Sequence, residues 1–391
     1  MATDRLYYAD AYLREFDARV AQIKTDGWIA LDRSAFYPTS GGQPHDTGFL
    51  LAGDREIRVT DVTVDDDGVV WHRLDGALTE GDAVHGRIDW PRRWDHMQQH
   101  AGDHMLAGAL WQMLGGVTIG LHTGEKDSTI DVSLPDGRTR LTDAEIEALE
   151  STVNQRVQQD DPIRCWFPSA DELASLPMRK RPTVREHVRV VAMGDYEMVP
   201  CGGTHPSSTG QIGPVKVLSC APAKGCMRLC FVAGMRAFRY FQAAARSAET
   251  TARLLSAPIE DAPAALEKEK EAAAQARRDA EARLLQAALE MILREKTGCV
   301  YACHVPFADP GLLVKAAAIL TREDGAAVAL LSCPRGEARQ MVFARGDQRK
   351  DDMAALLRAS GARGGGKPDL AQGSAPDGEA LRHAARALAQ D

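Results

Sequence analysis

The sequence lacks the features that mark membrane, secreted and strongly basic proteins. No stretch approaches the roughly 18 apolar residues of a membrane-spanning helix, so we expect no membrane contact. Residues 1–16 show no basic segment followed by an apolar one, and we therefore expect no signal peptide. Eight cysteines are too few for a disulfide framework in 391 residues, which favours reduced thiols in the cytoplasm. Because the net charge is −8, any contact with nucleic acid must use local basic clusters.

The hydrophobic patterns predict an α+β fold with several domains. A β-branched run predicts a strand at 57–64, and Asp89 before a proline predicts a helix over 91–113. A later stretch rich in Ala, Glu and Lys predicts two helices, with Pro258 and Pro263 at the bend between them. The predicted parts are a β-rich N-terminal domain at 1–90, a mixed α/β domain at 91–236, a helical hairpin spacer at 237–296 and a small C-terminal α/β domain at 297–391.

Two segments roughly a hundred residues apart carry side chains that bind transition metals. In HMQQHAGDH (96–104), histidines recur at every fourth position, so each neighbouring pair shares one face of the predicted helix. In CGGTH (201–205), Cys201 and His205 are also four apart, and the two glycines permit a tight loop. One thiolate with several imidazoles is typical of a tetrahedral zinc site, and zinc can activate water for hydrolysis.

Simpler interpretations exist for both segments. Histidines on a helix can form a solvated face, and a single cysteine is often part of a core. The presence of both halves favours a metal site, because tetrahedral closure needs complementary pairs. Cys226 and Cys230 are also four apart, as are Cys299 and Cys303 before His304, but their apolar neighbours favour ordinary strands over a second zinc site.

These motifs resemble the editing domain of alanyl-tRNA synthetases and its free-standing relatives of the AlaX group. The resemblance is carried by FYPTSGGQPHDTG at 36–48, HAGDHML at 100–106, CGGTH at 201–205 and TGQIG at 209–213. The stretch GGGKPDLAQ at 364–372 is similar to the glycine-rich motif of the synthetase C-terminal domain. The resemblance covers nearly the whole chain and fits the long AlaX form. It implies that residues 91–236 form a zinc-binding editing domain.

The resemblance also implies which residues bind the metal. The family's two-histidine pattern falls on His100 and His104, which leaves His96 outside the ligand set. Asp103 stands where the family often has Thr or Gln, and we take it as the candidate general base. The implied zinc ligands are His100, His104, Cys201 and His205.

Further substrate contacts are implied near the metal. Ser34 takes the position of a family threonine that faces the aminoacyl group, and its hydroxyl offers a hydrogen bond to a bound serine. Gln43 offers both a donor and an acceptor to the substrate. The plainer alternative is a Gly-Gly turn followed by a loop glutamine. The other predicted substrate-binding residues are Gly41, Gly42, Gly202, Gly203, Thr204 and Arg228.

Basic residues cluster around the zinc segments and in the glycine-rich stretch. Such clusters are usually solvated surfaces, but together with the resemblance they indicate contacts with tRNA phosphates. The glycine-rich stretch lacks the Gly-Lys-Ser/Thr of a triphosphate-binding loop. The predicted tRNA-binding residues are Arg92, Arg93, Arg179, Lys180, Arg181, Arg363 and Lys367, with Arg185 and Lys224 close to these clusters.

The resemblance implies a zinc-dependent deacylase of translation quality control that hydrolyses the ester of mischarged tRNA(Ala), with serine or glycine as the wrong amino acid. The sequence shows no aminoacylation segment, so we expect the chain to remove amino acids and not to attach them. We also expect a mischarged tRNA partner and a homodimer through the C-terminal domain. Two alternatives stay open: a non-catalytic tRNA-binding module with a structural zinc, since four protein ligands are typical of structural sites, and a hydrolase for another acyl substrate.

Overall fold

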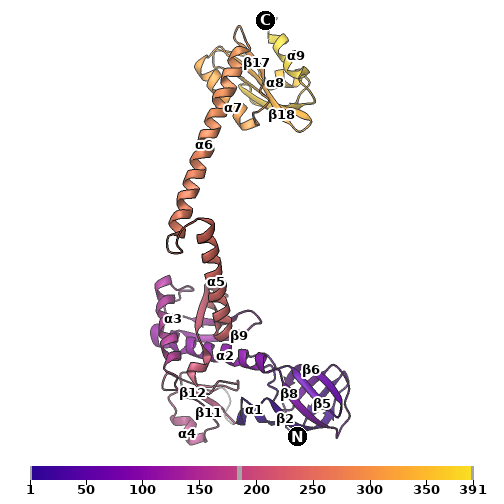
Figure 1. Cartoon of the computed structure of the whole chain (residues 1–391), viewed down its shortest axis with the longest axis vertical. Helices are drawn as coiled ribbons and strands as arrows, with labels where there is room; N and C mark the ends of the chain where they lie inside the picture. The colour runs from indigo at the N-terminus through magenta and orange to yellow at the C-terminus, as the bar shows by residue number, and fades with distance from the viewer. Residues whose placement is uncertain (1, 183–186, 389–391) are drawn as a thin grey trace. The chain divides into compact units, whose positions relative to one another are not determined.

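The computed structural model describes residues 2–182 and 187–388 (Figure 1). It contains both helices and sheets, as the predicted α+β class requires. The chain divides into two compact units, Met1–Ser247 and Ala248–Asp391. Among the described residues, no helix combines the length and the apolarity that crossing a bilayer demands.

The N-terminal strands of the first unit close into a barrel with the order β2-β3-β7-β6-β5-β8. In β2, Phe16, Ala18 and Val20 alternate with exposed residues, so one face of the strand fills the barrel core. The predicted strand at 57–64 is confirmed within β6. Closure of the barrel was not predicted, because it depends on pairing between distant strands. The strands are β2 (Glu15–Ile23), β3 (Trp28–Leu31), β5 (Gly48–Ala52), β6 (Arg55–Val64), β7 (Val70–Leu74) and β8 (Ala83–Ile88).

The helix α2 (Trp90–Leu114) is the predicted helix over 91–113. It begins where the Asp89 side chain accepts a hydrogen bond from the Arg92 amide, and it ends at Gly115, whose φ of 66° is left-handed. From His96 to Leu110 every residue of the helix is buried. A Cβ on Gly102 would lie 2.9 Å from the Cβ of Ala233, so the absence of a side chain there lets the helix approach β15 closely.

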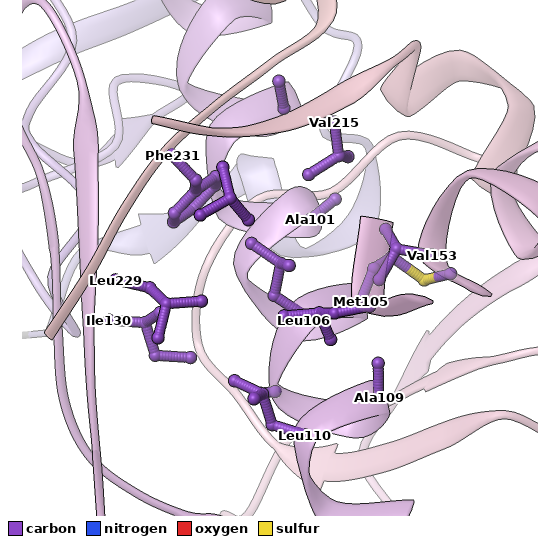
Figure 2. Packing of buried hydrophobic residues seen from close by; sticks show 14 of the residues in the cluster. Ala101, Met105, Leu106, Ala109, Leu110, Ile130, Val153, Val215, Leu229 and Phe231 are labelled. Atoms are coloured by element: carbon purple, nitrogen blue, oxygen red, sulfur yellow. The ribbon is translucent and has the colours of Figure 1, made fainter. Parts of the chain in front are cut away.

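Figure 2 shows this packing, with apolar side chains of α2 between those of β10, β15 and α3. A second, three-stranded sheet has the order β11-β12-β13, and its last strand leads into residues 201–205. Because α2 lies inside the unit, its histidines face protein and not solvent. The elements around it are β9 (Val117–Thr123), β10 (Ser128–Ser133), α3 (Asp143–Gln158), β11 (Ile163–Trp166), α4 (Ala170–Ser175), β12 (Val190–Met193), β13 (Glu197–Pro200), η1 (Thr209–Ile212), β14 (Val215–Ala223) and β15 (Cys226–Ala233).

The predicted spacer consists of α5 (Gly234–Leu254) and α6 (Ala262–Arg294), and Pro263 lies in the first turn of α6. The hairpin packing of these helices stays a prediction. The second unit has a sheet with the order β16-β17-β18-β19-β21-β20. Its other elements are β16 (Lys296–Thr297), β17 (Val300–His304), α7 (Pro310–Glu323), β18 (Val328–Arg335), β19 (Ala338–Arg345), α8 (Met353–Ala359), β20 (Arg363–Gly366), β21 (Leu370–Ala375) and α9 (Glu379–Leu388).

A buried polar pair lies inside the barrel. His72 of β7 and Ser34 of the short strand β4 (Arg33–Ser34) are both fully buried, with the His72 Nε2 atom 2.8 Å from the Ser34 Oγ. The Nδ1 atom lies 3.3 Å from the carbonyl oxygen of Ile29, which assigns the proton to Nδ1 and lets Nε2 accept from the serine. This arrangement fits a neutral imidazole, and burial lowers the pKa of His72 to about 4.

The neutral state of His72 predicts a pH-dependent stability. The unfolded chain binds the proton near its ordinary pKa of 6.5, whereas the folded barrel does not until about 4. The neutral His72 therefore contributes its full stabilisation above pH 6.5. This contribution, up to about 3 kcal/mol, is lost as the pH falls from 6.5 to about 4. Urea unfolding between about pH 7 and pH 4 should show this extra loss in the wild type relative to His72→Gln. Equal pH dependence of the two proteins would contradict it.

Candidate metal centre

The two predicted metal-binding segments meet inside the first unit. His100 and His104 project from successive turns of α2, and Cys201 and His205 come from the loop after β13. The three histidines are 2%, 5% and 3% exposed, which excludes the solvated-face interpretation. Cys201 is only half-buried.

The four donor atoms form a compact cluster. They all lie within 4.8 Å of one another. The Nε2 atom of His100 is 3.0 Å from the Cys201 Sγ and 3.3 Å from the His104 Nε2, and the Cys201 Sγ is 3.4 Å from the His205 Nε2. A tetrahedral zinc ion with ordinary bond lengths has donor–donor edges of roughly 3.3–3.6 Å. The 3.3 Å and 3.4 Å separations lie close to these edges and the 3.0 Å separation is shorter, so the four donors surround a space of the size of one ion.

The chemistry of the donor set also fits a cation. Burial lowers the pKa of His100 to about 4 and those of His104 and His205 well below the usual value, so the imidazoles are neutral. Their Nε2 atoms face the cluster, where they can bind a cation, whereas their Nδ1 atoms point away from it and have no hydrogen-bond partner among the described residues. Burial raises the pKa of Cys201 to about 12, while an amide hydrogen bond from Gly203 favours the thiolate. A divalent cation would satisfy all four donors and would keep the sulfur deprotonated.

Gln43 holds the metal-binding loop and does not face open space. Its Oε1 accepts a 3.1 Å hydrogen bond from the Thr204 amide, and its Nε2 donates to the Thr204 hydroxyl at 2.7 Å. Both residues are fully buried. The predicted functional position of Gln43 is thus adjacent to the centre, but its amide fixes the loop between Cys201 and His205.

Arg189 is a second anchor of the loop that the sequence interpretation missed. Its Nη1 donates to the carbonyl oxygens of Cys201 at 3.0 Å and Gly203 at 2.8 Å. The Arg189 carbonyl in turn accepts from the Cys201 amide, which continues the β12–β13 ladder by one residue. In the sequence, Arg189 directly precedes the strand β12. This strand pairs with β13, which leads to CGGTH. Sequence alone does not show this pairing.

The two glycines of the loop differ in their surroundings. A Cβ at Gly203 would lie 2.5 Å from the His100 Nε2 and 3.0 Å from the Gln43 Oε1. A Cβ at Gly202 would make an ordinary 3.4 Å contact with the Tyr8 hydroxyl. Only Gly203 is therefore required for the close approach of the loop to the metal-binding helix.

Asp103 and His96 lie on α2 next to the ligands. Asp103 is buried, its Oδ1 has no hydrogen-bond partner among the described residues, and burial raises its pKa to about 7. His96 is 3% exposed and lies outside the four-donor cluster, as predicted. Its Nδ1 atom also has no partner within the described part of the chain.

The other predicted substrate-binding residues lie farther from the donor atoms. Ser34 accepts from the Phe36 amide and contacts His72 inside the barrel, which argues against the predicted contact with a substrate hydroxyl. Arg228 lies on an exposed face of β15, where its Nε is 2.6 Å from an Asp131 carboxylate oxygen. That ion pair argues for a structural role.

The turn that precedes Gln43 contains the remaining two glycines. Gly42 has a φ of 82°, and a Cβ there would overlap the Leu121 side chain of β9. Its carbonyl oxygen also accepts a 3.0 Å hydrogen bond from the Thr123 amide. Gly41 faces open space. The turn therefore docks on β9 and so positions Gln43.

The predicted tRNA-binding residues divide into buried and exposed groups. Arg93 is fully buried, with its Nε 3.0 Å from an Asp46 carboxylate oxygen, and this argues against the predicted phosphate contact. Arg179 is largely buried and its Nε lies 2.9 Å from a Glu197 carboxylate oxygen. The others are half-buried Arg92 and exposed Lys180, Arg181, Arg363 and Lys367, whereas Arg185 lies outside the described residues.

Two parts of the chain match known protein families, and one of these parts contains the CGGTH loop. Residues 8–92 match the family described as tRNA synthetases class II (A). Residues 188–229, which include the CGGTH loop, match the threonyl and alanyl tRNA synthetase second additional domain. Among solved structures, the C-Ala domain of Aquifex aeolicus alanyl-tRNA synthetase is 21% identical, with a TM-score of 0.22, over 23% of this chain and 87% of that domain.

Curated relatives are similar over most of the sequence. The alanine–tRNA ligase of Pyrococcus furiosus is 36% identical over 277 residues, which is 68% of this chain and 30% of the ligase. That of Methanothrix thermoacetophila is 33% identical over 98% of this chain and 43% of the ligase. The alanyl-tRNA editing protein AlaX-L of Pyrococcus horikoshii is 35% identical over 60% of this chain and 59% of that protein. The chain thus spans between 30% and 59% of the length of these three relatives.

The glycine contacts predict a difference between two matched substitutions. Gly203→Ala should lower zinc content severalfold, because the added methyl group would occupy space next to the His100 Nε2. Gly202→Ala should retain zinc, since its Cβ fits. The measurement is metal content per chain after dialysis against a weak chelator. Equal zinc content in the two variants would contradict the assigned geometry.

Proposed function

Because the chain is homologous to alanine–tRNA ligases and to the alanyl-tRNA editing protein AlaX-L, we propose that it hydrolyses the aminoacyl ester of mischarged tRNA(Ala). The wrong amino acid is serine or glycine, and the reaction is a step of translation quality control in the cytoplasm. The convergence of His100, His104, Cys201 and His205 carries this proposal, because it supplies a buried site for the metal that such a hydrolysis uses. Bound there, zinc would supply a Lewis acid for the ester carbonyl or for water.

The protein side chains would serve mainly to hold this site in shape. Gln43 and Arg189 lie in distant segments of the chain, and both form hydrogen bonds with the 201–205 loop. They hold the Cys201 sulfur and the His205 imidazole against α2. Preorganised groups need no rearrangement when the reaction occurs. The unpartnered carboxylate oxygen of Asp103 makes this residue our candidate for holding a proton during hydrolysis.

A structural zinc in a non-catalytic tRNA-binding module is the second candidate, and the presence of four protein ligands favours it. The four-domain division at 1–90, 91–236, 237–296 and 297–391 and a homodimer through the C-terminal domain also remain part of the proposal.

A deacylation assay separates the two candidates. The wild type with zinc should release serine or glycine from mischarged tRNA(Ala) and should leave alanyl-tRNA(Ala) intact. His100→Ala should lower the rate at least roughly 100-fold, because it removes a metal ligand. His122→Ala is the matched control, since this exposed histidine of β9 lies outside the centre, and it should keep the wild-type rate.

Each alternative has its own outcome. Intact esters with both the wild type and His100→Ala would establish the structural-zinc module. Equal hydrolysis by both proteins would place the chemistry elsewhere. Hydrolysis of small seryl esters as efficiently as of tRNA esters would indicate another acyl substrate.

A further inference from the structure

A cavity of about 720 Å³ lies beside the first turns of α2, within the first unit. Its walls come from three places that are distant in sequence: the start of α2, the hairpin between β9 and β10, and the start of α5. This volume falls within the range of sites that bind small molecules and is too small for a nucleic-acid duplex. The residues that matter below are Arg92, Trp94, His96, Lys126, Arg236 and Arg239.

The cavity carries uncompensated positive charge. Arg236 is neutralised by Asp95, whose Oδ1 lies 2.9 Å from its Nε. Lys126 and Arg239 are exposed and make no ion pair with a described residue. Glu125 and Asp95 are the carboxylates of the wall. Cations without partners in a concave site attract anions.

A buried polar group also points to a ligand. His96 lines the cavity, is 3% exposed, and leaves its Nδ1 atom without a hydrogen-bond partner among the described residues. A neutral imidazole has one N–H, which can donate to an anionic oxygen. Arg92 lies one turn before His96 on the same helix, and its Nε is 3.0 Å from the His45 carbonyl oxygen.

The cavity is also close to the metal centre. His96 precedes the ligand His100 by four residues, which is about 6 Å along the helix axis. In an RNA end, one ribose separates the 5′ phosphate of the last nucleoside from the hydroxyl that carries the ester. One helical turn between His96 and His100 is of the size of one nucleoside, and the half-buried Trp94 offers an aromatic wall for a sugar or a base.

We propose that this cavity binds the phosphodiester on the 5′ side of the terminal nucleoside of a single-stranded RNA end. Lys126 and Arg239 contribute charge, and His96 contributes a hydrogen bond. The location of the ester rests on the proposed function, but the phosphate contact itself does not require hydrolysis.

The test is equilibrium binding of an uncharged RNA microhelix that ends in CCA, compared with the same RNA without its terminal nucleotide. The protein variants are Lys126→Ala with Arg239→Ala, and Arg246→Ala as a matched control. Arg246 is an exposed arginine of α5 that does not line the cavity. Binding of uncharged RNA makes the result independent of deacylase activity.

The double variant should bind the CCA-ended RNA about tenfold more weakly, and the slope of log affinity against log salt should fall by roughly 0.7 for one lost phosphate contact. The variant should bind the shortened RNA as well as the wild type does, because the phosphate is already absent. Arg246→Ala should match the wild type with both RNAs.

Three results would overturn the proposal. If the double variant loses the same affinity for both RNAs, the two cations attract RNA only in a general way. If it loses no affinity for either RNA, the cavity does not bind RNA. Tighter binding of adenosine 5′-monophosphate than of the RNA would identify a mononucleotide site. The deacylation assay above decides the proposed function separately, so failure of one does not imply failure of the other.

Discussion

The convergence of three neutral imidazoles and one sulfur on a single point is the constraint on which the first unit depends. Three buried imidazoles and one half-buried thiol within 4.8 Å of one another have few stable arrangements other than around a cation. Two of them come from a helix that is itself buried, and two come from a loop. A metal bound there would therefore connect α2 to the strands β11, β12 and β13. The positions of the four donor atoms then depend on how rigidly the helix and the loop are held.

Both sides are held by contacts between distant segments. The turn at Gly42 packs on β9, and the next residue, Gln43, forms hydrogen bonds with Thr204 of the loop. Arg189, just before β12, donates hydrogen bonds to two carbonyl oxygens of the same loop. The absence of a side chain at Gly203 brings the loop against His100. Within the stretches that resemble editing motifs, Gln43, Gly203 and Thr204 thus support the donor atoms.

Much of the centre could be predicted from the sequence, because the ligands come in pairs whose members are only four residues apart. The cap at Asp89 defines the start of α2, and the spacing of His100 and His104 places both on one face. The loop pair of Cys201 and His205 is equally local. The barrel, the anchoring by Arg189 and the burial of Arg93 could not be predicted in this way, because each depends on a partner far away in sequence, such as Asp46 for Arg93. The buried contact of Ser34 could not be predicted for the same reason, because its partner His72 lies 38 residues away.

X-ray absorption at the zinc edge of the purified chain would identify the atoms bound to the metal. We expect about one zinc per chain, with a shell of three nitrogens near 2.0 Å and one sulfur near 2.3 Å. Cys201→Ser should remove the sulfur contribution from that shell. A chain that binds no zinc, or a zinc shell without sulfur in the wild type, would contradict the assignment of the four residues to one metal centre.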